Sequence, residues 1–135
     1  MIRRVDHLGI AVRSIAEARG FYEALGLEIG AVEEVPQEKV RVAMIRCGET
    51  RLELLEPTDP ESPIARFLEQ RGPGIHHVCL GSDDLDADDR SLRQSGARLL
   101  RDRPTAGAGG ARVQFVHPKS AGGVLVELAQ GGHGE

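Results

Sequence analysis

The sequence has few cysteines and no long apolar run. Two cysteines in 135 residues are too few for a disulfide framework. We expect Cys47 and Cys79 to be small buried side chains in a reducing cytosol. No stretch approaches the roughly 20 apolar residues that span a bilayer. The N-terminal segment MIRRVDHLGIAV also lacks the apolar stretch and cleavage site of a signal peptide. These absences predict a cytoplasmic protein without a membrane partner.

Positive charge is also scarce. The chain has 17 lysines and arginines against 21 aspartates and glutamates, which gives a net charge of -4. Proteins that bind nucleic acid usually carry a basic stripe, so the charge argues against a nucleic-acid partner. Hydrophobic residues make up 40% and charged residues 28%, as in ordinary globular proteins. The length suits one compact domain, or two small modules that share a core.

An internal repeat organises the chain. Each half shows one strand, one helix and three further strands, judged by hydrophobic periodicity and by turn residues. In the first half the strands are expected at 4–12, 27–34, 39–46 and 50–56, and the helix at 14–26. In the second half the strands are expected at 74–80, 97–101, 112–117 and 123–129, and the helix at 82–96.

The predicted fold class is therefore α+β. It consists of two tandem β-α-β-β-β modules that form a curved mixed sheet around a metal cleft. We expect a single domain over 1–130, followed by a flexible tail at 131–135. Within the domain, module 1 covers about 4–57, a linker helix about 62–71, and module 2 about 74–129.

The repeat extends to individual residues. Aligning DHLGIAV with HHVCLGS places His7 on His77, and aligning RLELLEP with VLVELAQ places Glu53 on Glu127. Imidazole nitrogens and carboxylate oxygens suit Zn, Co, Ni, Fe or Mn. Strand alternation puts all four residues on the face that helix packing does not need. Two modules related by a pseudo-twofold axis would bring equivalent positions together, which predicts one shared metal site with four protein ligands.

Other residues compete for these roles. His76 is the rival of His77, and strand alternation does not decide between them. The alignment places Asp6 on His76, which favours His77. Glu56 rivals Glu53 but precedes Pro57 on the apolar face. A lone histidine or glutamate on a strand is usually a surface residue, and only the recurrence in both halves argues for ligands.

Two charged segments have simpler interpretations. The acidic cluster from Asp83 to Asp89 is expected to be a solvated helix start. Lys119, in the segment His117-Pro118-Lys119, could meet an anionic substrate, and an exposed turn lysine is an equal alternative.

The paired modules with histidine and glutamate ligands resemble the vicinal oxygen chelate superfamily, the glyoxalase I-like proteins. Within it the sequence is similar to the methylmalonyl-CoA epimerases. The resembling segments are VDHLGIAV, RLELLEP, SPIARFL, GIHHVCL and FVHPKSAGGVLVEL, which together run from residue 5 to 128.

The resemblance implies a homodimeric enzyme that acts on an acyl-CoA. It would interconvert (2R)- and (2S)-methylmalonyl-CoA by proton abstraction next to the thioester, through a metal-stabilised enolate. It implies one divalent metal per chain, Co²⁺ in the first place and Zn²⁺, Mn²⁺ or Ni²⁺ otherwise. The implied ligands are His7, Glu53, His77 and Glu127, and Glu127 is also the implied catalytic base. Relatives often carry glutamine in place of Glu53. Val42 stands where some relatives have a second catalytic glutamate.

Two other functions fit the same fold. A glyoxalase I, or lactoylglutathione lyase, uses the same two histidines and two glutamates, so the ligands alone do not decide between the enzymes. The segment from His117-Pro118-Lys119 to GGVLVEL favours the epimerase. A metal-free binding module for small molecules is the alternative from another class, although such modules lack the ligand set.

Overall fold

The structure is a computed structural model, and it describes residues 1–132. The predicted tail at 131–135 therefore lies mostly outside the described residues. The chain divides into two compact units. One unit is His7–His76, and the other combines Met1–Asp6 with the chain from His77 onward. In the described part of the chain, no helix has both the length and the apolar character needed to cross a membrane.

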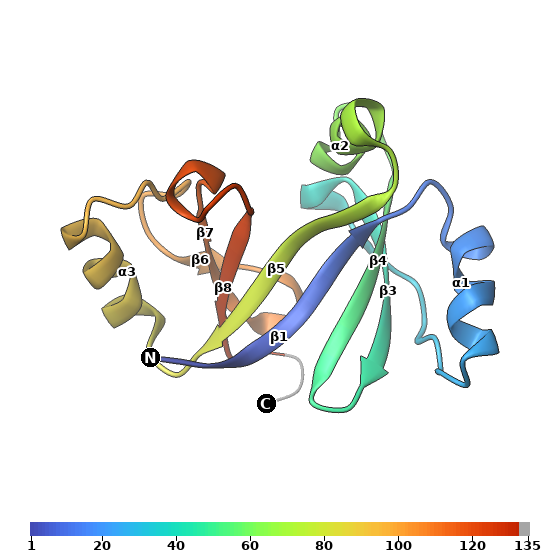
Figure 1. The fold of residues 1–135 in the computed structure, drawn as a ribbon, viewed down its shortest axis with the longest axis horizontal. Helices are drawn as coiled ribbons and strands as arrows, with labels where there is room; N and C mark the ends of the chain where they lie inside the picture. The colour runs from blue at the N-terminus through green and yellow to red at the C-terminus, as the bar shows by residue number, and fades with distance from the viewer. Residues whose placement is uncertain (133–135) are drawn as a thin grey trace. The chain divides into compact units, whose positions relative to one another are not determined.

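The first unit follows the predicted order β-α-β-β-β and ends with a further helix (Figure 1). Its elements are β1 (Ile2–Ala11, here from His7 onward), α1 (Ile15–Ala24), β2 (Glu33–Val35), the short 3₁₀ turn η1 (Pro36–Glu38), β3 (Val40–Cys47), β4 (Thr50–Pro57) and α2 (Pro63–Arg71). The strands lie in the order β2-β3-β4-β1. β1 runs parallel to β4, and the other neighbours are antiparallel.

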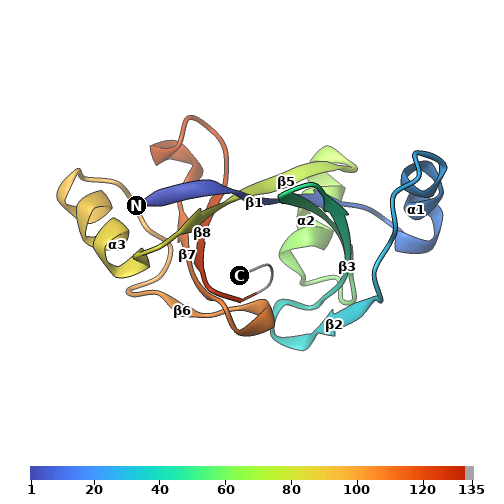
Figure 2. The same cartoon turned by 90° about the horizontal axis from the view of Figure 1, so that it is seen from below.

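The two helices of this unit pack on opposite faces of β4. Ile15 of α1 contributes to a buried cluster with Leu54, Ala43 and Ile45. On the other face, α2 packs against Leu55 through its own buried apolar residues. Figure 2 shows the two helices on the two sides of β3 and β4. Since Glu53 alternates with Leu54, it shares the face on which α2 lies.

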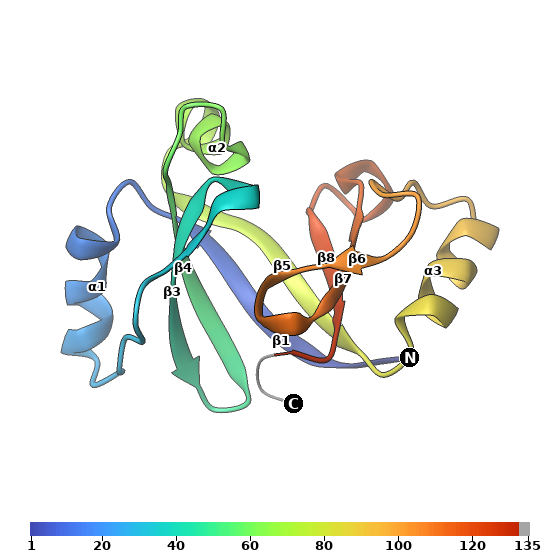
Figure 3. The same cartoon turned by 180° about the vertical axis from the view of Figure 1, so that it is seen from behind.

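The second unit repeats this plan. Its elements are β5 (Gly74–Ser82), α3 (Leu85–Gln94), β6 (Thr105–Ala106), η2 (Ala108–Gly110), β7 (Arg112–Val116), η3 (Pro118–Ser120) and β8 (Val126–Gln130). The strand order is β6-β7-β8-β5, with β5 parallel to β8 and the others antiparallel. Figure 3 shows α3 beside β7 in this unit. Leu85 of α3 packs on Leu128 and Val116, so α3 covers the face opposite Glu127.

Some predicted strands are wrong in extent. The strand expected at 27–34 is reduced to a single bridge from Ile29 to Ile45 and to the three residues of β2. The strand expected at 97–101 is a single bridge at Leu99, whereas β6, in the loop expected to be flexible, was not predicted. Both missed segments lie at the outer edges of the sheet order, where pairing depends on distant partners.

Candidate functional site

His7 and Glu53 lie side by side in the first unit. The β1–β4 ladder pairs Gly9 with Glu53 and His7 with Arg51, so the three polar side chains share one face. The Nε2 atom of His7 is 3.5 Å from Oε1 of Glu53. His7 is only 7% exposed, although it is polar. A buried imidazole beside a carboxylate is therefore fixed at this point by the register of two parallel strands.

His77 and Glu127 repeat this arrangement in the second unit. The β5–β8 ladder pairs Cys79 with Glu127, and His77 precedes Cys79 by two residues, just as His7 precedes Gly9. Nε2 of His77 is 3.2 Å from Oε1 of Glu127. His77 is 8% exposed. The same pair of side chains thus recurs at the same register in both repeats.

The geometry of each pair fits two ligands of one metal ion. Bonds of about 2.1 Å to nitrogen and oxygen, at tetrahedral or octahedral angles, place neighbouring ligand atoms about 3.0–3.4 Å apart. The observed separations of 3.5 Å and 3.2 Å lie close to this range. A neutral imidazole nitrogen and a carboxylate oxygen also suit a borderline divalent ion chemically. Each repeat therefore offers one such pair of donors.

The rival residues have other partners. Glu56 accepts hydrogen bonds from the backbone N–H of Ile15 at 2.8 Å and from Arg41 Nη1 at 2.7 Å. His76 places its ring edge-on to Phe67 of α2, with the ring centroids 5.2 Å apart. Glu56 thus anchors the start of α1, and His76 packs against a helix, whereas their neighbours Glu53 and His77 form the histidine–glutamate pairs.

Comparison with known proteins shows the same fold and relatives over the whole chain. Residues 6–115 match the family described as Glyoxalase/Bleomycin resistance protein/Dioxygenase superfamily. The chain belongs to this superfamily. The predicted recognition and the predicted fold class are both confirmed.

Within the superfamily, the similar proteins are epimerases. The chain is 43% identical over 133 residues to the ethylmalonyl-CoA/methylmalonyl-CoA epimerase of Cereibacter sphaeroides, covering 96% of this chain and 99% of that one. It is 40% identical over 129 residues to the mitochondrial methylmalonyl-CoA epimerase of Bos taurus, covering 94% and 74% of the two chains. A solved structure of a methylmalonyl-CoA epimerase in complex with methylmalonyl-CoA and NH4+ has a TM-score of 0.92 at 37% identity, and the match covers 100% and 99% of the two chains.

This member of the superfamily carries a buried arginine beside one of its histidine–glutamate pairs, which the sequence reasoning missed. Arg51 is 7% exposed and lies in register with His7, on the face that carries Glu53. The available signal was a break in the repeat, because the position equivalent to Arg51 in VLVELAQ is Leu125.

Other predicted candidates lie in plain structural settings. Val42 is in register with Leu55 and packs against the apolar cluster under α2, so its surroundings are hydrophobic. His117 begins η3, and its Nδ1 accepts a hydrogen bond from Lys119 N–H at 3.0 Å. Lys119 is exposed. Cys79 is fully buried as expected, but Cys47 is exposed, which corrects that expectation.

The acidic cluster of α3 is only partly a solvated helix start. Asp89 is 7% exposed and accepts hydrogen bonds from Arg93 Nε at 2.7 Å and from Gln114 Nε2 at 2.9 Å. Burial of the Asp89 carboxylate acts to raise its pKa, but the bonds from Arg93 and Gln114 outweigh this and hold the pKa below its usual value. Asp89 is therefore a buried link between α3 and β7, which corrects the expectation for this residue.

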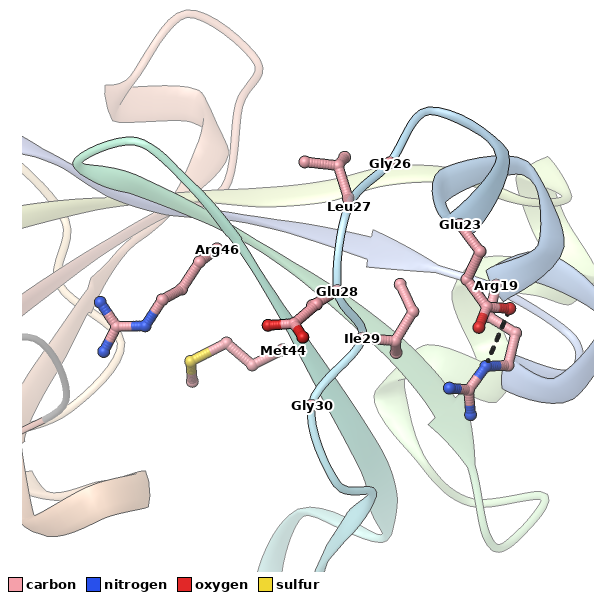
Figure 4. Close-up of a pocket in the computed structure, with 9 residues that line it drawn as sticks. All are labelled: Arg19, Glu23, Gly26, Leu27, Glu28, Ile29, Gly30, Met44 and Arg46. Carbon is pink, nitrogen blue, oxygen red and sulfur yellow. Dashed lines mark hydrogen bonds and ion pairs between the residues drawn. The ribbon is translucent and has the colours of Figure 1, made fainter.

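A hollow of about 670 Å³ lies at the edge of the first unit (Figure 4). Its walls come from the second half of α1, the segment 26–30 and two residues of β3. In the close-up, Met44 and Arg46 project to one side of β3, whereas Ile29 and Arg19 lie on the other. None of the four predicted ligands lines this hollow. It is a surface feature of the sheet edge, separate from the histidine–glutamate pair of this unit.

Proposed function

We propose that this protein is a metal-dependent epimerase that interconverts (2R)- and (2S)-methylmalonyl-CoA. The observation that carries the proposal is the full-length similarity, at about 40% identity, to enzymes named for this reaction. A solved relative with methylmalonyl-CoA bound matches the whole chain at a TM-score of 0.92. The buried histidine–glutamate pair in each repeat supplies side chains suited to the chemistry.

In the proposed site, His7, Glu53, His77 and Glu127 hold one divalent metal ion per chain. The support is that both pairs have donor atoms at separations suited to one ion and stand at the same register of the repeat. Cobalt is the first expectation, with zinc, manganese or nickel as alternatives, because all accept imidazole and carboxylate ligands. The metal, when bound, supplies Lewis-acid stabilisation of the negative charge that develops on the substrate oxygens.

Glu127 is the proposed base that removes the proton next to the thioester carbonyl. Its register neighbours on the two adjacent strands are Cys79 and Phe115, so its surroundings on this face are apolar. An apolar surrounding limits access of water to the proton in transit. A positioned carboxylate contributes about 10²–10⁴-fold to such a proton transfer. The enolate then receives a proton on the opposite face, which completes the inversion at the α carbon.

Inversion requires proton delivery from the face that Glu127 does not serve. Val42, where some relatives have glutamate, cannot supply a proton, so another group fills this role in the present chain. The substrate is an acyl-CoA, and the assembly is proposed to be a homodimer, as the family resemblance implies.

A racemisation assay tests the proposal. Purified protein is stripped of metal, reloaded with Co²⁺, Zn²⁺, Mn²⁺ or Ni²⁺ and given (2S)-methylmalonyl-CoA. We expect the 2R epimer to form, and deuterium from D₂O to enter the α carbon, only in the metal-loaded protein. Methylglyoxal with glutathione serves as the control substrate. Turnover of that hemithioacetal without epimerisation would identify a glyoxalase I, and metal-independent ligand binding without turnover would identify a binding module.

A further inference from the structure

Arg51 is the point at which the two repeats differ in charge next to the proposed ligands. In the first unit the ladder places His7 beside Arg51, and in the second unit Leu125 takes the equivalent position. The proposed ligands match pairwise, whereas a buried guanidinium has no counterpart in the other repeat. Identical pairs of ligands do not distinguish the two ends of a substrate. A residue that breaks the repeat does.

The burial of Arg51 indicates that its charge has a purpose at this face. Arginine is rarely as little as 7% exposed, because removing a charge from water costs several kcal/mol unless partners compensate. Its guanidinium has five N–H donors, so contacts within the protein leave room for a ligand as well. Two parallel N–H groups match a carboxylate in the bidentate manner that favours arginine over lysine.

The surrounding face separates apolar from charged residues. Towards one end of β4, Leu55 and Val42 lie in register and belong to the apolar cluster under α2. Towards the other end, Arg51 lies in register with Arg46 of β3, which is exposed. Glu53 stands between these two ends. A substrate that reacts beside Glu53 would therefore find positive charge on the Arg51 side.

We propose that Arg51 binds the free carboxylate of the substrate and restricts this enzyme to acyl-CoA thioesters that carry a carboxylate on the α carbon. The inference rests on the proposed epimerase function and adds a specificity residue to it. A hemithioacetal of glutathione has no carboxylate at the equivalent carbon, so the same arginine would also disfavour the glyoxalase substrate.

The test compares two probes that share the whole CoA moiety. Malonyl-CoA carries the α-carboxylate and acetyl-CoA lacks it. Dissociation constants are measured by calorimetry for metal-loaded wild type, Arg51→Gln, Arg51→Lys and the matched control Arg46→Gln. We expect Arg51→Gln to weaken malonyl-CoA binding by about 10-fold to 100-fold, the range for a hydrogen bond to a charged group. Acetyl-CoA binding should stay within about twofold by the same reasoning, because no charged partner is lost.

The variants separate charge recognition from a structural role. Arg51→Lys keeps the charge and should retain most of the preference for malonyl-CoA, and Arg46→Gln should keep the wild-type preference. Metal content is measured for each variant. Equal weakening of both probes, or an unchanged preference in Arg51→Gln, would overturn the inference. So would loss of metal without loss of preference, which would make Arg51 a support for the ligands.

Two further arms distinguish the remaining outcomes. The guanidinium could instead bind a phosphate of CoA, in which case Arg51→Gln would weaken acetyl-CoA but not acetyl-pantetheine, and the carboxylate assignment would be wrong. The racemisation assay on wild type reports separately on the proposed function. Racemisation by wild type with an unchanged preference in Arg51→Gln sinks only the inference, and the opposite combination sinks only the epimerase.

Discussion

Glu56 Oε1 accepts a hydrogen bond of 2.8 Å from the backbone N–H of Ile15, the first residue of α1. Gln130 makes the equivalent bond of 2.8 Å to Leu85, the first residue of α3. The first N–H groups of a helix have no partner within the helix, so each acceptor satisfies one of them. In both repeats the last strand therefore holds the start of the helix three residues beyond its histidine-paired glutamate.

The first prediction concerns this helix anchor. Glu56→Ala and Gln130→Ala should each lower the free energy of unfolding by about 1 kcal/mol, the usual cost of losing an acceptor at a helix start. Urea denaturation at neutral pH measures both. Glu49→Ala, at an exposed position in the β3–β4 turn, is the control and should change the free energy of unfolding by less than about 0.5 kcal/mol. Glu56→Ala should keep its metal, and a loss as large as that in Glu53→Ala would move the ligand to Glu56.

The second prediction compares the two adjacent histidines. His77 pairs with Glu127, whereas His76 packs against Phe67. His77→Ala should therefore lower metal content far below one ion per chain, and His76→Ala should leave it near the wild-type value. Elemental analysis of dialysed protein gives the answer directly. If both variants kept the same amount of metal, the present choice of ligands would have to be abandoned.

Much of the fold followed from local signals in the sequence. Ser14 accepts the N–H of Glu17 at 3.2 Å and Ser62 that of Ile64 at 3.1 Å, so both helix starts were readable from capping residues. The edge strands were not readable in this way. Gly30 is in extended chain that runs close to Met44, where an added Cβ would lie 3.1 Å from the Met44 carbonyl oxygen. Its pairing is set by that distant contact and not by periodicity.

The candidate pairs were readable because the repeat carries a register as well as residue types. The sequence offered a further signal that went unused, since Glu56 and Gln130 are separated by the same 74 residues as Glu53 and Glu127. Ile15 and Leu85 likewise share the 70-residue offset of the histidines. Arg51 was missed for a different reason. Its burial depends on the packed structure, and a charged strand residue is usually exposed.

The third prediction concerns acid stability. The pKa of Asp89 is lower in the folded protein than in the unfolded chain, because bonds from Arg93 and Gln114 outweigh the effect of burial. The charged carboxylate therefore stabilises the fold above its unfolded pKa, about 3.9, and this contribution is lost as the pH falls through the lower folded pKa. Stability of wild type should thus fall with pH below about 4 more steeply than that of Asp89→Asn.

The measurement is urea denaturation from pH 7 to pH 2.5. At neutral pH, Asp89→Asn should already be less stable by about 1–3 kcal/mol, because Arg93 and Gln114 lose a charged acceptor. Glu49→Gln is the control for an exposed acid and should follow the wild-type curve. Parallel pH curves for wild type and Asp89→Asn would show that this carboxylate does not contribute to the acid transition.

The last prediction separates metal binding from proton transfer at Glu127. Glu127→Gln keeps an oxygen that can bind a metal but removes the basic carboxylate. The variant should keep much of its metal and lose a factor of about 10²–10⁴ in epimerisation rate. Glu53→Gln is the matched control, because Glu53 holds the equivalent place in the other repeat and relatives often carry glutamine there. That variant should retain both metal and most of the activity.

Exchange of the α proton in D₂O locates the defect. If Glu127 serves one face of the substrate, exchange from one epimer should collapse in Glu127→Gln, while the other epimer still exchanges slowly through the second base. Glu53→Gln should exchange both epimers. The contrast between two variants that change the same atoms at equivalent places excludes a general effect of lost charge. Near-wild-type epimerisation by metal-loaded Glu127→Gln would falsify the assigned role, and the base would then have to be sought among the other polar side chains near the two histidine–glutamate pairs.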